Sequence, residues 1–214
     1  MNLVIQIITN VLTALYQPFW FAVLLSVFVM FFYLYAYCPL EAGKGWKSAI
    51  RVWIKQFRSS TKYRRLFLLT FCTVMILFRT LLNRTIWANP VSNVMGAWWI
   101  WSTSSDGTVI LTTECIENII LMLPFDFLLL CTAKDRLITN MELTNVLLVA
   151  TKISFLFSLS IELLQLLLRL GTFQFSDLFY NTLGGFIGGF MYWICYILKH
   201  KDRHFADSGQ ASRQ

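Results

Sequence analysis

Five apolar stretches, each close to the ~20 residues that cross a bilayer, dominate this chain of 214 residues. They are Pro18 to Tyr37, Leu66 to Ile86, Cys115 to Cys131, Asn145 to Leu168 and Asp177 to Leu198. Hydrophobic residues make up 57% of the sequence and charged residues only 14%, which lies outside the range of soluble domains. We therefore predict an all-α, polytopic transmembrane bundle of about five membrane-spanning helices.

The segment before the first span has its own polar pattern. Gln6, Asn10 and Gln17 recur near helical spacing, while leucines and isoleucines occupy the other faces. This pattern favours an interfacial amphipathic helix that ends where Pro18 opens the first span, with a short additional membrane segment as the alternative. The expected organisation is a segment 1–65 (N-terminal helix, first span and basic loop), a membrane-helix domain 66–198 and a flexible tail 199–214.

Positive charge is concentrated at two places outside the spans. The stretch from Glu41 to Arg65 holds eight lysines and arginines against one acid, and the C-terminal tail is also basic. The positive-inside rule therefore predicts that residues 41–65 and the C-terminus are cytoplasmic. Counting through five spans then places the N-terminus and the loops near 87–114 and 169–176 outside.

Aromatic and aliphatic residues alternate with the cations of the basic stretch at helical spacing, for example at Trp46, Ile50, Trp53 and Phe57. A helix lying on the anionic inner leaflet explains this pattern, because each cation near such a surface contributes roughly 1 kcal/mol. Nucleic-acid binding is the alternative, but the flanking spans tether the stretch to lipid. We therefore predict the lipid bilayer as a partner and no nucleic acid.

Tryptophans gather in the predicted outer loop, at Trp87, Trp98, Trp99 and Trp101. Because Trp collects at the headgroup level of membranes, these residues are expected to anchor the loop at the interface. A stacking platform for a sugar-bearing ligand is the alternative.

Cysteines and histidines give little sign of a metal or nucleophilic site. The five cysteines are scattered singly, as expected for small packing residues. His200 and His204 lie four apart in the tail and precede Asp207, where a solvated, frayed segment is a better explanation than a metal site. We predict no metal and no cofactor.

The spans nevertheless carry ionisable and amide side chains. A charge at the bilayer centre costs on the order of 2.5 to 3.5 kcal/mol, so such residues normally face a protein interior or a wet cavity. On the fourth span, Ser158, Glu162, Gln165 and Arg169 fall within a stripe about 60° wide at 100° per residue. This span therefore has one polar face.

The fifth span repeats the same offsets with Asp177, Asn181, Gly184 and Gly188. Gly171 permits a tight reversal between the two spans, so we expect their polar stripes to face each other near the outer surface. Small residues at 184 and 188 also allow another helix to approach closely.

Two more spans contribute polar groups at the same depth. Arg79, Asn83 and Arg84 end the second span, and Glu117 and Asn118 open the third. Because polar groups from four spans are expected to meet at one depth, we predict an outward-facing polar pocket. The alternative is that they only form interhelical hydrogen bonds, worth about 0.6 kcal/mol per bond. The predicted pocket comprises Arg79, Asn83, Glu117, Asn118, Ser158, Glu162, Gln165, Arg169, Asp177 and Asn181, with Pro124, Gly184 and Gly188 in structural roles.

Asp126 lies deeper, two residues after Pro124, which interrupts the third span. An unpaired carboxylate there would be costly, so we expect it to be paired or to face water. Lys152 is the candidate partner, and snorkelling of this lysine to the inner interface is the alternative.

Three short motifs resemble the VanZ-like family of bacterial membrane proteins. They are NIILMLPFDFLLL at 118–130, S-x-x-x-E-x-x-Q at 158–165 and D-x-x-x-N-T-L-G-G at 177–185. The resemblance covers roughly residues 79–198 and implies a bacterial plasma-membrane protein associated with glycopeptide (teicoplanin-type) resistance. The chain departs from the family pattern at Asp126, where glycine is usual, and at Gln174 and Ser176, where acids are common. These departures weaken any proposal of an acidic metal cluster.

Three hypotheses follow from this combination. In the first, the outer pocket binds a glycopeptide antibiotic or a lipid-linked cell-wall precursor. In the second, an intramembrane enzyme modifies a lipid-linked substrate, with Glu162 or Asp177 as base and Arg169 holding a phosphate. In the third, the chain is a small transporter or sensor whose polar path continues through Asp126. Whether any reaction is catalysed stays open at this stage.

Overall fold

A computed structural model describes residues 3–37, 45–84, 86, 88–103 and 107–211 of the chain. Its elements are α1 (Leu3–Tyr37), α2 (Gly45–Ser59), α3 (Thr61–Leu77), the π-helical turn η1 (Phe78–Leu82), strands β1 (Trp101–Thr103) and β2 (Val109–Leu111), and helices α4 (Glu114–Leu137), α5 (Leu143–Leu168) and α6 (Phe175–Ala211). Five helical segments are long and apolar enough to cross a membrane, namely Leu3–Tyr37, Thr61–Leu82, Glu114–Leu137, Leu143–Leu168 and Phe175–His200. The predicted all-α class with about five spans is confirmed, and the protein is a membrane protein.

Helix α1 runs without interruption from Leu3 to Tyr37, with Pro18 in its interior. The separate N-terminal amphipathic helix ending at Pro18 is therefore not observed, because the polar segment and the first span form one helix. Proline removes one backbone hydrogen bond, but membrane helices tolerate it where neighbouring groups compensate. Pro18 is almost fully buried, so packing holds this part of the helix in place.

Helix α3 begins at a side-chain cap and ends in a wider turn. The Ser60 hydroxyl accepts a hydrogen bond from the Tyr63 amide at 3.2 Å, which satisfies one free donor of the first turn. At the other end the Asn83 amide donates to the Phe78 carbonyl at 2.9 Å, five residues back. Such a π-turn inserts extra chain into the helix and changes the direction of the side chains that follow.

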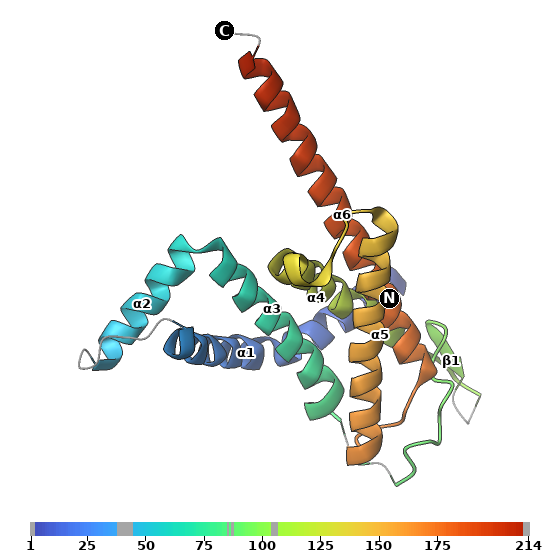
Figure 1. Cartoon of the computed structure of the whole chain (residues 1–214). Helices are drawn as coiled ribbons and strands as arrows, with labels where there is room; N and C mark the ends of the chain where they lie inside the picture. Colours follow the sequence, from blue (N-terminus) through green and yellow to red (C-terminus); the bar gives the residue numbers. More distant parts are fainter. Residues whose placement is uncertain (1–2, 38–44, 85, 87, 104–106, 212–214) are drawn as a thin grey trace.

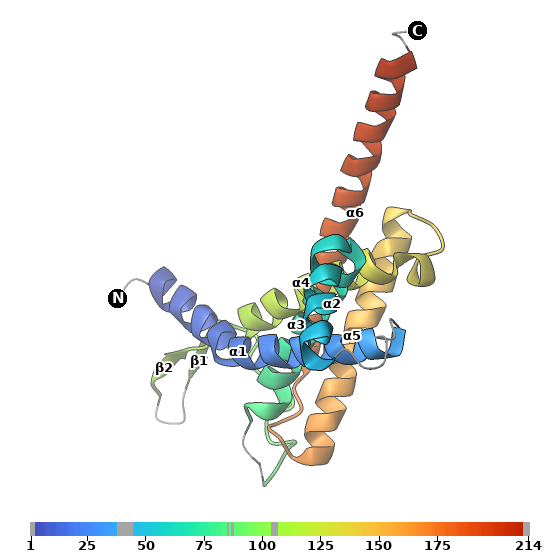
Figure 2. The same ribbon diagram turned by 90° about the vertical axis from the view of Figure 1, so that its left-hand side faces the viewer.

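Figures 1 and 2 show that α1 lies at a steep angle to α5, whereas α5 and α6 run at a smaller angle to each other. Helix α6 packs against both α4 and α5, while α1 packs mainly against α3. Beyond the bundle, α6 projects away from the other helices towards its C-terminal end (Figures 1 and 2). The predicted tail 199–214 therefore starts as a continuation of α6, which is helical to Ala211.

A short antiparallel hairpin marks one end of the bundle and was not predicted. Strands β1 and β2 pair with Trp101 opposite Leu111. The Phe173 and Phe175 amides donate to the Pro90 and Val94 carbonyls, so the 88–100 loop packs on the α5–α6 turn. We call this the hairpin end, where α3 finishes and α4 begins; the basic end is the opposite one, where Arg65, Lys134 and Lys199 lie.

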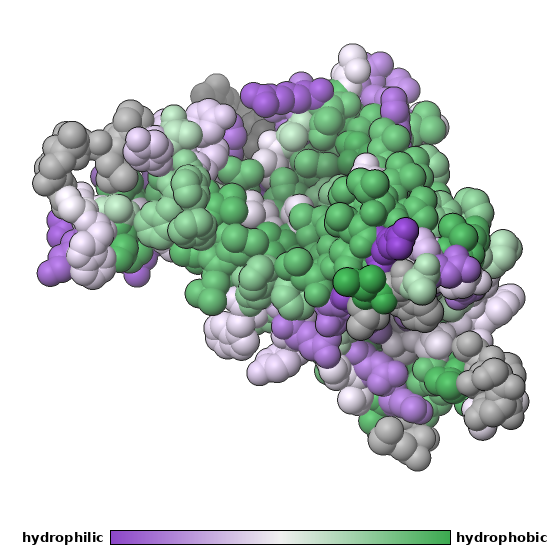
Figure 3. Space-filling model, turned by 90° about the horizontal axis from the view of Figure 1, so that it is seen from below, coloured by the Kyte–Doolittle hydropathy of each residue, from purple (hydrophilic) through white to green (hydrophobic). Residues whose placement is uncertain are grey.

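Much of the surface is apolar, as expected for a protein that faces lipid. On α1 alone, Trp20, Leu24, Phe28 and Phe32 each expose about 60% or more of their surface. Figure 3 shows a broad hydrophobic surface with hydrophilic residues gathered towards its edges.

The glycines of α6 allow α4 and α5 to approach its backbone. A Cβ atom on Gly184 would lie 2.7 Å from the Ile119 carbonyl oxygen, and one on Gly188 would collide with the Leu123 carbonyl. On the neighbouring face, a Cβ atom on Gly185 would collide with Ser154. Backbone carbonyls cannot rotate away, so these positions require glycine at the observed spacing.

Gly188→Ala should lower the stability of the bundle by about 1 to 3 kcal/mol, because the added methyl group overpacks the α4–α6 contact. The midpoint of thermal unfolding in detergent measures this effect. Ala36→Val, which adds bulk at an exposed position of α1, is the control and should leave the midpoint unchanged. Equal midpoints for both variants would contradict the close α4–α6 packing.

Candidate functional site

Helix α5 buries one polar face against its neighbours. Ser154 and Ser158 are fully buried, and Glu162 and Gln165 are each 2% exposed. The Asn181 amide on α6 donates to the Ser158 hydroxyl at 2.9 Å, so the two polar stripes face each other as expected. Because the steps of three and four residues place these side chains on one side of α5, the buried polar groups form a column along this helix.

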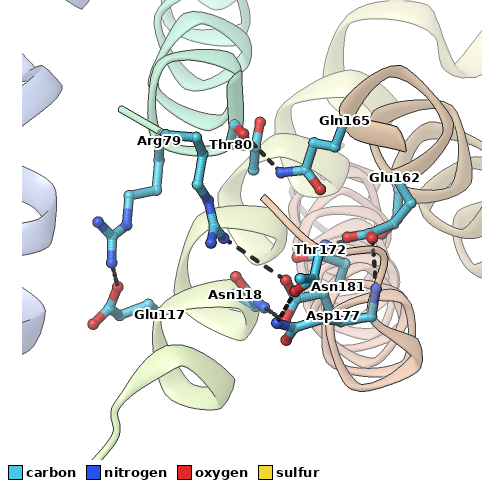
Figure 4. A network of polar contacts seen from close by, with 12 residues as sticks. Arg79, Thr80, Glu117, Asn118, Glu162, Gln165, Thr172, Asp177 and Asn181 are labelled. Atoms are coloured by element: carbon cyan, nitrogen blue, oxygen red, sulfur yellow. Dashed lines mark hydrogen bonds and ion pairs between the residues drawn. The ribbon is translucent and has the colours of Figure 1, made fainter. Parts of the chain in front are cut away.

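The Glu162 carboxylate lies at the start of α6. Its Oε2 accepts a hydrogen bond from the Gln174 amide at 2.8 Å, immediately before the first residue of that helix (Figure 4). The positive end of a helix dipole and its free amides favour a negative charge. The Gly171 φ angle of 92° allows the chain to reverse between the two helices. Glu162 therefore fixes the α5–α6 turn.

Gln165 connects α5 to the π-turn. Its Nε2 donates to the Thr80 carbonyl oxygen at 2.7 Å (Figure 4). Thr80 lies inside η1, where the i→i+4 hydrogen-bond pattern is interrupted. A side-chain amide thus satisfies a backbone carbonyl that the irregular helix leaves available.

Asp177 joins α6 to α4 and to the end of the second span. Its Oδ1 accepts from the Asn118 amide at 2.9 Å, and its Oδ2 lies 3.9 Å from the Arg84 guanidinium (Figure 4). Asp177 is 8% exposed, whereas the Arg84 side chain is 31% exposed. The short contact to Asn118 therefore holds the carboxylate more directly than the long ion pair does.

Arg79 and Glu117 form the closest ion pair of the site, at 2.6 Å (Figure 4). The Thr113 hydroxyl donates to the other Glu117 oxygen at 2.7 Å. Glu117 is 6% exposed, and the Arg79 side chain is 29% exposed. Both carboxylate oxygens thus have a donor, and part of the guanidinium remains accessible.

This ion pair lines an open cavity of about 360 Å³ at the hairpin end, which we call the polar pocket. Helix α1, the β2–α4 connection and the first turn of α4 form its other walls. Its polar lining consists of Asn10, Thr13, Gln17, Arg79, Thr112, Thr113, Glu114 and Glu117. Donors, acceptors and both charge signs therefore surround one accessible space.

The predicted residues separate into two groups. Arg79 and Glu117 line the polar pocket. The buried hydrogen-bond network holds Asn118, Ser158, Glu162, Gln165, Asp177 and Asn181. The expectation that all of them surround one outward cavity is therefore not met, because the network is packed between helices.

Asn83 and Arg169 lie outside both groups. Asn83 is exposed and donates to Gln17 on α1 at 3.1 Å, because the π-turn changes its direction. Arg169 follows the last residue of α5 with a left-handed φ angle of 55° and is exposed. Arg169 does not continue the polar stripe of α5, because the residue has already left the helix.

Asp126 has a different partner from the one expected. Its Oδ2 accepts from the Ser154 hydroxyl at 2.6 Å, and Asp126 is fully buried, whereas Lys152 is exposed. Gly185 packs against this pair. Pro124 lies within α4, two residues earlier.

Several pocket residues were missed in the sequence because they lie on α1. Asn10, Thr13 and Gln17 are spaced by three and four residues, which places them on one helical face. That spacing was a usable signal. The spacing alone does not show that these residues belong to the first span, because Pro18 resembles a helix boundary in the sequence but lies inside α1.

The tryptophans of the 88–103 loop have different environments. Trp98 packs on Phe179 and Tyr180, and the Tyr180 hydroxyl donates to the Trp98 carbonyl at 2.6 Å. Trp99 is 77% exposed and Trp101 is 50% exposed. Trp87 lies outside the described residues. The hairpin therefore presents two exposed indole rings while the third fixes the loop to α6.

Arg79→Gln should destabilise the protein by roughly 1 to 3 kcal/mol, because it leaves the buried Glu117 carboxylate without its cationic partner. The double variant Arg79→Gln/Glu117→Gln should recover much of this loss, since no charge then stays unpaired. Thermal unfolding in detergent of wild type, Arg79→Gln, Glu117→Gln and the double variant measures the coupling. Additive losses would show that the ion pair does not contribute.

A family model described as VanZ/LLP1 matches residues 19–196. No curated protein and no solved structure matches the chain. The match begins before the 79–198 region that carries the three motifs, so it includes the second half of α1, after Pro18, as well as the buried network. It spans well over half of the sequence, and the chain belongs to the VanZ/LLP1 family.

Proposed function

We propose that this protein contributes to glycopeptide resistance by binding an amphiphilic ligand in the polar pocket at the hairpin end. The ligand is either the lipophilic glycopeptide itself (teicoplanin-type) or the lipid-linked cell-wall precursor that such a drug sequesters. Family membership links the chain to glycopeptide resistance at a general level. The observation that carries the finer proposal is the accessible cavity around the Arg79–Glu117 pair.

The surroundings of the pocket favour a ligand with both a polar and an apolar part. A shallow, open apolar groove lies on the face of α1 and is lined by residues of this helix alone, Leu12, Tyr16 and Phe19 among them. Thr13 lines both the groove and the polar pocket. A head group in the pocket can therefore continue into a hydrocarbon chain along α1, where apolar contact is favourable.

The hairpin supplies aromatic surface beside the pocket. The Thr112 hydroxyl and amide bond to the Trp99 and Ile100 carbonyls, which fixes the hairpin to the pocket wall. The exposed ring of Trp101 lies on β1, and that of Trp99 lies two residues before this strand. Flat indole rings suit stacking on sugar or aromatic parts of a ligand, which extends the contact area beyond the cavity.

Thr13→Phe should abolish most of the resistance, because the added ring fills the junction between groove and pocket. Thr13 is exposed and its hydroxyl donates to the Thr9 carbonyl of the same helix, so the fold tolerates the change. Ser160→Phe on α5 is the matched control, since Ser160 is also exposed and also bonds four residues back. Growth inhibition by teicoplanin is measured in a susceptible host expressing each protein.

Wild type and Ser160→Phe should raise the inhibitory concentration by about the same factor. Binding of teicoplanin and of a lipid-linked precursor to the purified proteins distinguishes the two ligands. If wild type gave no protection, or if Thr13→Phe protected as well as wild type, the proposal would fail.

The proposal requires the hairpin end to face the cell exterior and the C-terminus to be cytoplasmic. The basic residues on α2 and at the ends of α4 and α6 support this orientation. A fluorescent protein fused to the C-terminus should therefore fluoresce, and alkaline phosphatase inserted beside the exposed Gly107 should be active. The opposite pattern would place the polar pocket on the wrong side for an external drug.

A further inference from the structure

A second cavity, of about 490 Å³, lies at the basic end, where α3, α4 and α6 meet. It shares no residue with the polar pocket. Each of the three helices contributes a cation to it: Arg65 from α3, Lys134 from α4 and Lys199 from α6. Among the residues that the structure describes, none lining this cavity is acidic. The cavity thus presents convergent positive charge in a volume typical of ligand sites.

The cations stand in defined positions. The Arg65 guanidinium donates to the Cys131 carbonyl at 3.1 Å. The Lys134 ammonium lies 5.8 Å from the centre of the Tyr196 ring, which favours a cation over its face. Asp135 lies 3.5 Å from Lys134, but its side chain is 88% exposed, so solvent weakens this pair. The positive charge of the cavity is therefore only partly compensated.

The lining changes from apolar to charged along the helices. On α4, Phe127 and Leu128 precede Lys134, and on α6 the buried Tyr192 precedes Lys199. Both helices run towards the basic end, so the apolar walls lie deeper on each of them. Seven residues of helix span about 10 Å, which is a short distance from hydrocarbon-like lining to cationic rim.

The position of the cavity matches the boundary between hydrocarbon and head groups. Helix α4 ends at Leu137 and the membrane-length part of α6 ends at His200, within two turns of the cations. Basic pockets between membrane helices at such ends attract anionic lipid head groups. The depth of the cavity, the order of its apolar and cationic lining and its positive charge all fit a molecule with an anionic head group and apolar chains.

We infer that this cavity binds an anionic membrane lipid, with its phosphodiester head group between Arg65, Lys134 and Lys199 and its upper acyl chains against Phe127, Leu128 and Tyr192. The site differs from general attraction of the basic helix α2 to the bilayer, because it is enclosed by three spans. It is independent of the function proposed for the polar pocket.

Cys195 gives a direct measurement of occupancy, because it lines the cavity and is exposed with a free thiol. The purified full-length protein is incubated in neutral detergent with dioleoylphosphatidylglycerol and then treated with N-ethylmaleimide. Peptide mapping follows alkylation of Cys195. Phosphatidylglycerol should slow this alkylation at least fivefold, while phosphatidylcholine, glycerol 3-phosphate and inorganic phosphate should leave the rate unchanged.

Two double variants with the same loss of charge separate the cavity from the basic surface. Lys134→Gln/Lys199→Gln should abolish protection by phosphatidylglycerol, whereas Lys47→Gln/Lys55→Gln on α2 should keep it. Helical content by circular dichroism verifies that both remain folded. Equal protection by phosphatidylcholine, protection by phosphate alone, or full protection in the Lys134/Lys199 variant would each overturn the inference.

Discussion

Buried polar groups in a membrane protein must find partners within the protein, because hydrocarbon offers no water. The column on α5 meets this requirement with groups from other helices. Ser154 bonds to Asp126 on α4, Ser158 to Asn181 on α6, and Glu162 to the amide at the start of α6. Each of these bonds specifies which helix lies beside α5 and at what height. Apolar contacts alone could not specify the neighbouring helix or its height, since leucines pack equally well against lipid or protein.

The glycines of α6 are the necessary complement of this polar column. The Ser154–Asp126 bond crosses between α5 and α4 past Gly185, where any side chain would collide with Ser154. At Gly184 and Gly188 the α4 backbone itself comes close. Polar bonding and close backbone approach therefore depend on each other, which explains why polar residues and small residues share the first half of this helix.

The sequence could predict the membrane-spanning helices and which of their faces are polar, because hydropathy and helical periodicity are local properties. Predictions from the sequence were wrong where a neighbouring element or an irregular turn determines the course of a helix or the direction of a side chain. Pro18 stays inside α1 because packing holds the helix together, and the π-turn redirects Asn83. Arg169 leaves the stripe through a left-handed φ angle. The hairpin and the α1 wall of the polar pocket depend on long-range contacts that a single periodic pattern does not contain.

The two cavities lie at opposite ends of the bundle, which raises the question of a path between them. Asp126 and Ser154 are fully buried midway, and Met122 and Leu130 on α4 are fully buried as well. These side chains fill the space that a continuous polar path would need. Opening one would require α6 to separate from α4, which the backbone contacts at Gly184 and Gly188 oppose. In this conformation the arrangement favours separate binding at each membrane surface over passage across the membrane, so the small-transporter hypothesis would require a second, differently packed state.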